Sequence, residues 1–222
     1  MKKTIATGIV FIILTLPALL SASPANAQGK SGPNALDERV KAFLADREDT
    51  WEDLNVPESD GELLYDLVIK NSYKRALEIG TSTGHSAIWI AWALSKTGGR
   101  LITVEIDPDR HRQALENFRA AGLAGYIDAR LADAHDLVKE LKGPFDFIFC
   151  DADKGWYLNY FLDLYPKLEA GGCYAAHNVS ERRWGRGGIG AFYEHVKSLP
   201  DMETTIDDRG SGMSISYKRR PR

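Results

Sequence analysis

Two scarcities limit what this chain of 222 residues can be. It has only two cysteines, Cys150 and Cys173, which are too few for a disulfide-built scaffold or for a zinc site made of thiolates. It also has no excess of charge of one sign, because 28 Lys and Arg residues stand against 31 Asp and Glu residues, and this balance argues against a dedicated binder of DNA or RNA. What the chain does have is 44% hydrophobic residues, enough for a folded domain stabilised by burial of apolar surface.

Residues 1–27 have the layout of a secretory signal peptide. Two lysines precede an uncharged run, whose most apolar part is residues 9–20, and a small-residue triplet ends at Ala27. The apolar part is shorter than the roughly 20 residues that a spanning helix needs, and Pro17 lies within it. We therefore expect cleavage near Ala27, export to the periplasm or beyond, and no stable membrane anchor afterwards. The alternative is a retained membrane anchor. It would leave the domain on the same, non-cytoplasmic side of the membrane, because positive charge before an apolar run stays in the cytoplasm.

The rest of the chain divides into a leader and one main domain. Residues 28–56 begin with a stretch rich in Gly, Ser, Pro and Asn, which indicates flexibility, and continue as an amphipathic helix at 37–47. A second helix is expected at 60–71. We assign residues 28–56 to the flexible leader with its N-terminal helix and residues 57–222 to the main domain.

The main domain alternates β-type and helical segments. The β-type runs are residues 75–80, 101–106, 126–131, 145–150 and 173–178. The helical runs are residues 84–95, 109–121, 134–141, 156–165 and 188–199. Short strands alternating with helices of roughly ten residues imply right-handed crossovers and a parallel sheet. The last two runs, 203–206 and 213–218, flank a spacer too short for a crossover helix and predict an antiparallel hairpin. The predicted class is therefore α/β, with an open, mostly parallel sheet and helices on both faces.

Polar residues follow the predicted strands, at the sheet edge where open α/β folds bind their ligands. The first strand leads into a glycine-bracketed loop, residues 80–86. Gly80 and Gly84 permit tight turning and close backbone approach, and the free amides at the helix start near Ser86 favour an anionic group. Glycine at a strand-to-helix turn is often only a steric requirement, so this loop by itself leaves ligand binding open.

Acidic residues follow the second and third strands. Glu105, at the tip of the strand after the glycine loop, can accept two hydroxyl hydrogen bonds from a ribose, whereas a plain surface acid is the simpler alternative. Asp133, followed by Ala134, could meet an adenine amino group and is equally suited to N-cap the next helix. The pattern favours a nucleoside ligand.

The tips of the fourth and fifth strands carry a carboxylate, an imidazole and a carboxamide. These belong to Asp151, His177 and Asn178, which together can hold a divalent ion, although a hydrogen-bonded polar cluster is the simpler interpretation. Lys154 lies three residues after Asp151 and could serve as its ion-pair partner or as a proton acceptor.

Four segments carry a resemblance to a known family, namely residues 77–86, 104–107, 145–154 and 210–213. Taken together, they resemble the S-adenosylmethionine-dependent O-methyltransferases that include the catechol and caffeoyl-coenzyme A O-methyltransferases, and the similarity extends over about residues 57–218. The resemblance implies a Rossmann-like class I methyltransferase fold. It also implies transfer of the methyl group of S-adenosylmethionine to a hydroxyl of a small, catechol-like or phenolic acceptor. Dimers are common in the family, which suggests a homodimer by analogy only.

The resemblance further implies roles for individual residues. Glu78, Gly80 and Ser86 would cradle the methionine part of the cofactor, and Glu105 would hold its ribose. The whole set implied to bind the cofactor is Glu78, Gly80, Thr81, Ser82, Gly84, Ser86, Glu105, Asp133, Ala134 and Asp151. The residues implied to be catalytic are Asp151, His177 and Lys154, the last as the base.

The chain departs from the family pattern at the metal. The resemblance implies a divalent ion, usually magnesium, held by Asp151 and an Asp-Asn pair, but His177 and Asn178 stand where that pair is expected. A nitrogen ligand in place of a carboxylate should weaken magnesium binding and favour manganese, iron, nickel or zinc. Alternatively, His177 binds no metal and acts as a base poised near neutrality. A second departure is at residues 179–186, where three arginines could grip an acidic acceptor or form a solvated loop.

Two other functions compete with methyl transfer. An exported, non-catalytic protein could use the same cleft for a different nucleoside-like ligand. A nicotinamide-dependent dehydrogenase is disfavoured, because residues 80–84 lack the Gly-x-Gly-x-x-Gly spacing that a dinucleotide pyrophosphate requires.

Overall fold

The computed structural model describes residues 33–220, apart from 52–53 and 181–187. The predicted signal peptide, residues 28–32 and most of the arginine-containing segment 179–186 therefore lie outside the described residues. Within the described ranges, no helix combines the length and the apolar character needed to cross a membrane.

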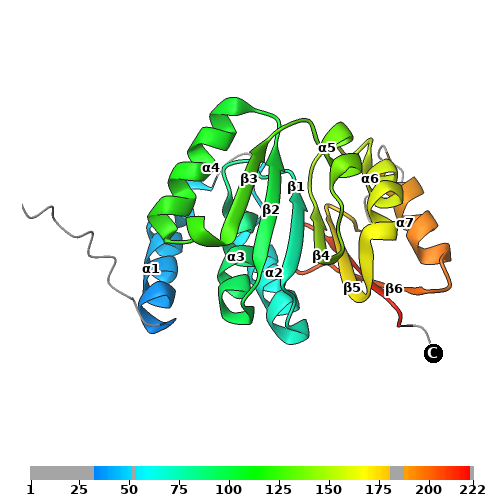
Figure 1. Cartoon of the computed structure of the whole chain (residues 1–222), viewed down its shortest axis with the longest axis horizontal. Helices are drawn as coiled ribbons and strands as arrows, with labels where there is room; N and C mark the ends of the chain where they lie inside the picture. The colour runs from blue at the N-terminus through cyan, green and yellow to red at the C-terminus, as the bar shows by residue number, and fades with distance from the viewer. Residues whose placement is uncertain (1–32, 52–53, 181–187, 221–222) are drawn as a thin grey trace, which may run out of the picture. The chain divides into compact units, whose positions relative to one another are not determined.

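A seven-stranded sheet runs through the described part of the chain, in the order β3-β2-β1-β4-β5-β7-β6 (Figure 1). Its strands are β1 (Arg75–Ile79), β2 (Arg100–Glu105), β3 (Ile127–Leu131), β4 (Phe145–Cys150), β5 (Leu168–His177), β6 (Met202–Asp207) and β7 (Met213–Lys218). The strands from β1 to β5 pair in parallel, whereas β7 runs antiparallel to both β5 and β6. The mostly parallel sheet and its C-terminal antiparallel hairpin are both confirmed.

Helices cover both faces of this sheet, as predicted. They are α1 (Pro33–Asp46), α2 (Glu58–Asn71), α3 (His85–Thr97), α4 (Pro108–Ala121), α5 (Ala134–Glu140), α6 (Tyr157–Leu164) and α7 (Ile189–Ser198), with short 3-10 segments η1 (Glu48–Thr50), η2 (Ala124–Tyr126) and η3 (Tyr165–Lys167). Successive residues of a strand point to opposite faces. In β4, Phe147 and Phe149 belong to the apolar cluster of α2 and α3, while Ile148 and Cys150 belong to that of α6 and α7. Because both faces of the central strands are buried, their sequences are nearly continuous apolar runs.

Two elements, β5 and α1, begin four or more residues earlier than predicted. β5 starts at Leu168 rather than at residue 173, because the Gly171–Gly172 pair, which suggests a turn, lies inside the strand, and the pairing with β4 shifts register in this region. α1 starts at Pro33 rather than at residue 37, and proline is well tolerated in the first turn of a helix.

Two glycines let the loop between β1 and α3 pack closely against its neighbours. Gly80 has a φ of +96° and Gly84 a φ of +100°. A Cβ atom on Gly80 would lie 2.4 Å from the carbonyl oxygen of Asp151, and one on Gly84 would lie 2.5 Å from the ring of Phe118. Only glycine combines the left-handed backbone with such a close approach, so the loop starts beside Asp151, which follows β4, and ends against Phe118 of α4.

One ionisable side chain lies completely inside the core. Glu78, in β1, has no exposed surface, and its Oε2 accepts a hydrogen bond from the hydroxyl of Thr103. Its Oε1 has no hydrogen-bond partner among the described residues. Burial raises the pKa of Glu78 to about 8, although the hydroxyls of Ser86 and Thr103 favour the charged form.

This buried carboxyl group makes stability depend on pH. Folded Glu78 keeps its proton while the unfolded chain releases it, so its contribution to the free energy of unfolding should fall as pH rises from about 4.5 to about 8. The variant Glu78→Gln removes this ionisation. Denaturant unfolding of both proteins at pH 5 and pH 8 measures the effect. The free energy of unfolding of the variant, relative to that of wild type at the same pH, should be at least about 1 kcal/mol higher at pH 8 than at pH 5. A difference that stays constant with pH would contradict the assignment.

Candidate functional site

A cavity of about 710 Å³ opens where the parallel strands end. Nine of the predicted site residues line it, namely Gly80, Ser82, Glu105, Asp133, Ala134, Asp151, Lys154, His177 and Asn178. They lie at or just after the ends of the five parallel strands β1 to β5. The structure therefore brings them together at the sheet edge where open α/β folds bind ligands.

Four other residues predicted to bind the cofactor do not line this cavity. They are Glu78, Thr81, Gly84 and Ser86. Thr81 is buried and its hydroxyl is hydrogen-bonded to that of Thr103, and Ser86 is buried in the first turn of α3. These four residues do not form the wall of the cavity, and their role in cofactor binding stays a prediction.

Glu105 is fixed by three backbone amides. Its Oε2 accepts the N–H of Ser82 at 2.7 Å, and its Oε1 accepts those of Ile106 at 3.1 Å and Asp107 at 2.9 Å. A carboxylate has about four acceptor sites, so Glu105 keeps one, on Oε2, for a hydroxyl group of a ligand. The prediction that Glu105 binds two ribose hydroxyl groups stays a prediction.

The cavity wall combines acids with exposed aliphatic side chains. Asp133 N-caps α5, where its Oδ1 accepts the N–H of His135 at 2.9 Å, and it also borders the cavity. Leu54 and Ile106 line the same cavity and are 67% and 64% exposed. Apolar surface beside a few convergent polar groups is typical of a small-molecule site.

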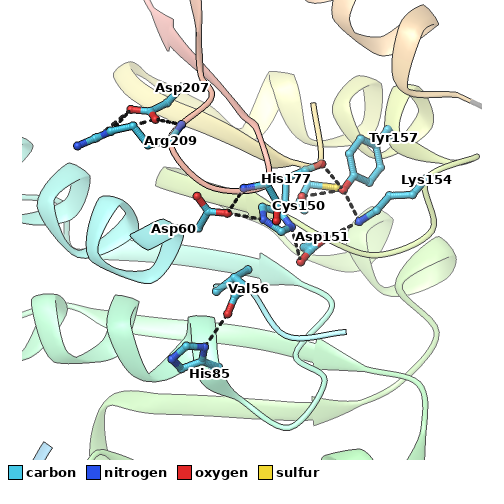
Figure 2. A network of polar contacts seen from close by, with 11 residues as sticks. Val56, Asp60, His85, Cys150, Asp151, Lys154, Tyr157, His177, Asp207 and Arg209 are labelled. Carbon is cyan, nitrogen blue, oxygen red and sulfur yellow. Dashed lines mark hydrogen bonds and ion pairs between the residues drawn. The ribbon is translucent and has the colours of Figure 1, made fainter. Parts of the chain in front are cut away.

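Lys154 is anchored between a carboxylate and a phenol (Figure 2). Its Nζ is ion-paired with Asp151 Oδ1 and lies 2.9 Å from Tyr157 Oη. Tyr157 Oη is itself 3.1 Å from the carbonyl oxygens of Cys150 and His177, to one of which it donates. Burial raises the pKa of Tyr157 well above its ordinary value. The phenol therefore keeps its proton, and its oxygen accepts a hydrogen bond from Lys154.

His177 lies between two carboxylates. Its Nε2 is 2.8 Å from Asp60 Oδ2, and its Nδ1 is 3.1 Å from Asp151 Oδ2 (Figure 2). Asp60 belongs to the first turn of α2, is 1% exposed and also accepts the N–H of Ser211 at 2.9 Å. Burial by itself lowers the pKa of His177, but the bonds to Asp151 and Asp60 outweigh it and raise the pKa to about 9.

The predicted metal ligands Asp151, His177 and Asn178 all line the cavity. His177 Nε2 faces Asp60, whereas Nδ1 lies 3.1 Å from Asp151 Oδ2 and makes no hydrogen bond to a described residue, so Nδ1 is the nitrogen that could present a lone pair to an ion. In the ranges that the structure describes, no group of three or more His, Cys, Asp or Glu side chains is arranged to hold a metal ion. The metal site stays a prediction.

Three residues around Lys154 and His177 were not predicted from the sequence, namely Asp60, Tyr157 and Ser211. Asp60 is 117 positions away from His177 in the chain, and its sequence context is that of an ordinary acidic residue in the first turn of a helix. Tyr157 has the sequence context of a core residue, and its ring is buried, but its hydroxyl group lies 2.9 Å from Lys154 Nζ. Ser211 lies in a segment that the resemblance marks, but it acts through its backbone N–H, for which residue type gives no signal.

A larger cavity, of about 920 Å³, lies at the other end of the strands, where they begin. The starts of β1, β2 and β4 form it, and charged side chains such as Lys74, Arg100 and Asp146 line it. None of the predicted site residues borders this cavity. Because parallel sheets bind ligands at the carboxyl ends of their strands, the smaller cavity is the candidate site.

Comparison with curated proteins gives relatives that are named as O-methyltransferases. The chain is 44% identical over 112 residues to a catechol O-methyltransferase of Niastella koreensis, a match that covers 49% of this chain and 50% of the relative. It is 32% identical over 134 residues to caffeoyl-CoA O-methyltransferase 1 of Eucalyptus globulus, which covers 58% of this chain and 54% of the relative. The chain thus spans about half the length of the curated relatives it matches.

Solved structures extend the similarity to most of the chain. An O-methyltransferase from Bacillus cereus in complex with SAH is 27% identical, with a TM-score of 0.68 over 86% of this chain and 94% of that one. The O-methyltransferase TomG from Streptomyces achromogenes, in complex with SAM, is 28% identical, with a TM-score of 0.69 over 83% of this chain and 91% of that one. A family model described as O-methyltransferase matches residues 30–184, more than half of the sequence. This chain belongs to the O-methyltransferase family.

Proposed function

We propose that this chain transfers the methyl group of S-adenosylmethionine to a hydroxyl group of a small phenolic or catechol-like acceptor. The observation that carries the proposal is the cavity at the strand ends, where the Glu105 carboxylate and the Lys154–Asp151 ion pair share one space of about 710 Å³. Relatives named as catechol and caffeoyl-CoA O-methyltransferases, and solved neighbours in complex with SAM or SAH, support this choice of chemistry.

The charge of the cavity suits this cofactor. The cationic side chains of its lining are Arg110, Lys154 and His177, and the carboxylates are those of Glu105, Asp107, Asp133, Asp151 and Asp153. The excess of acids attracts a sulfonium, whose positive charge is lost on methyl transfer, so the cavity favours the cofactor over its product. The exposed aliphatic side chains of Leu54 and Ile106 offer an apolar surface to the nucleobase.

In the transfer, an O–C bond forms as the S–C bond breaks, so the acceptor oxygen must lie in line behind the sulfonium methyl. Lys154 Nζ stabilises the developing phenolate by its charge. The neutral amine, formed when Lys154 loses one proton to solvent, to which its side chain is 35% exposed, accepts the proton that leaves the hydroxyl, and this restores the ammonium. The products are a methyl ether and S-adenosylhomocysteine.

The enzyme works outside the cytoplasm in this proposal, which is supported by the signal-peptide layout of residues 1–27. Its expected partners are the cofactor and a small acceptor, without nucleic acid. N-terminal sequencing of the exported chain should show that it begins at or near Gln28. A chain that keeps Met1 and stays in the cytoplasmic fraction would contradict this part of the proposal.

The variant Glu105→Gln tests the cofactor site. It removes the charged acceptor for a ligand hydroxyl, and S-adenosylmethionine should bind at least tenfold more weakly, since a hydrogen bond to a charged group contributes roughly 1.5–3 kcal/mol. Titration calorimetry measures the affinity. The control Asp109→Asn, an acid of α4 that is 78% exposed, should bind as wild type does. Equal affinities of all three proteins would refute the role of Glu105.

Methyl transfer itself is tested with labelled S-adenosylmethionine and a panel of catechols and monophenols. Wild type should label at least one acceptor, and Lys154→Met should keep its cofactor affinity while kcat falls by about a hundredfold or more, the usual contribution of a positioned acid or base. The control Lys139→Met, an exposed lysine of α5, should keep full activity. Tight cofactor binding without transfer to any acceptor would favour a non-catalytic binding protein instead.

A further inference from the structure

The side chain of Lys154 is long and flexible, so its amino group needs partners that hold it toward an acceptor. We propose that Tyr157 is a positioning residue of methyl transfer: its hydroxyl group and the Asp151 carboxylate together fix the orientation of the Lys154 amino group. The inference rests on the proposed function, in which Lys154 accepts the proton of the acceptor hydroxyl. It adds a buried residue outside the cavity lining, which acts through Lys154.

Two contacts are needed to orient an amino group, because with one contact it still rotates about that bond. Nζ of Lys154 is ion-paired with Asp151 Oδ1 and lies 2.9 Å from Tyr157 Oη (Figure 2). Since the nitrogen is tetrahedral, these two contacts and the bond to Cε leave one further position, which holds an N–H in the ammonium and the lone pair in the neutral amine. Tyr157 has no exposed surface and holds Nζ from the buried side, so the free position is left for the cavity that Lys154 lines.

The hydroxyl group of Tyr157 is itself held by two strand ends. Its oxygen lies 3.1 Å from the carbonyl oxygens of Cys150 and His177, the last residues of β4 and β5. A carbonyl group only accepts, so the phenol keeps its proton and donates it on this side. The lone pairs of the oxygen remain for a donor, and Lys154 is that donor. The position of the amino group is thus set by the ends of two neighbouring parallel strands.

Packing against α7 fixes both the ring of Tyr157 and the backbone of Lys154. The Tyr157 ring meets that of Phe192 edge-on, with 5.7 Å between the ring centroids. A Cβ atom on Gly188, just before α7, would lie 2.8 Å from the carbonyl oxygen of Lys154. An oxygen on a buried, packed ring has already lost its conformational freedom on folding, so it holds Lys154 at little further entropic cost.

A double-mutant cycle on the full chain measures the coupling between Tyr157 and Lys154. Tyr157→Phe removes only the hydroxyl oxygen. The affinity for S-adenosylmethionine and the KM of the acceptor should therefore stay within about twofold of wild type, while kcat falls about tenfold or more, as expected when a reacting group is misplaced. In Lys154→Met the hydroxyl group has no amino group to orient, so adding Tyr157→Phe should change kcat less than about twofold. The control Tyr174→Phe removes another fully buried hydroxyl of the same apolar cluster, outside the cavity lining, and should keep full activity.

Nuclear relaxation of the lysine Nζ atoms measures the orientation of the amino group without any turnover. The order parameter of the bond from Cε to Nζ in wild-type Lys154 should be at least about twice that of Lys139, whose side chain is 53% exposed. It should fall toward the Lys139 value in Tyr157→Phe. Lys154→Met identifies the Lys154 signal by its loss.

A wild-type Lys154 signal as disordered as that of Lys139 overturns the proposal, whether or not Tyr157→Phe folds. So does a folded Tyr157→Phe with the kcat of wild type, or one that lowers kcat equally with and without Lys154. Weaker cofactor binding at unchanged kcat would give Tyr157 a purely structural role and also overturns the proposal. A wild-type chain that methylates no acceptor overturns the proposed function alone, since the relaxation measurement still decides whether Tyr157 orients Lys154.

Discussion

The parallel pairing of β1, β2, β4 and β5 is the constraint on which the site depends. It brings the carboxyl ends of these strands to one edge of the sheet, so that Glu105, Asp151 and His177, which are far apart in the sequence, border one cavity. The antiparallel strand β7 is needed as well, because it pairs with β5 and delivers the backbone of Ser211 to Asp60. The chemistry of the site is thus a consequence of topology more than of any local motif.

Most of the fold can be predicted from local patterns, and so can the part of the site that lies on strand tips. Strands alternating with helices predict the parallel sheet, and a short spacer predicts the final hairpin. Glu105, Asp151 and His177 are visible because each is a polar residue at the end of a short apolar run. The start of β5 could not be predicted, because the Gly171–Gly172 pair ordinarily signals a turn and here lies inside a strand.

The parts of the site that depend on long-range packing could not be predicted. Asp60 reaches His177 only because α2 packs against the sheet, and an acid in a first helical turn is ordinarily explained by the helix dipole alone. The glycine loop needs such packing information as well. Thr81 and Ser86 resemble ligand-binding residues by their place in that loop, yet their side chains are buried and do not line the cavity. Backbone dihedral angles decide which loop residues form the wall, and residue types alone do not specify those angles.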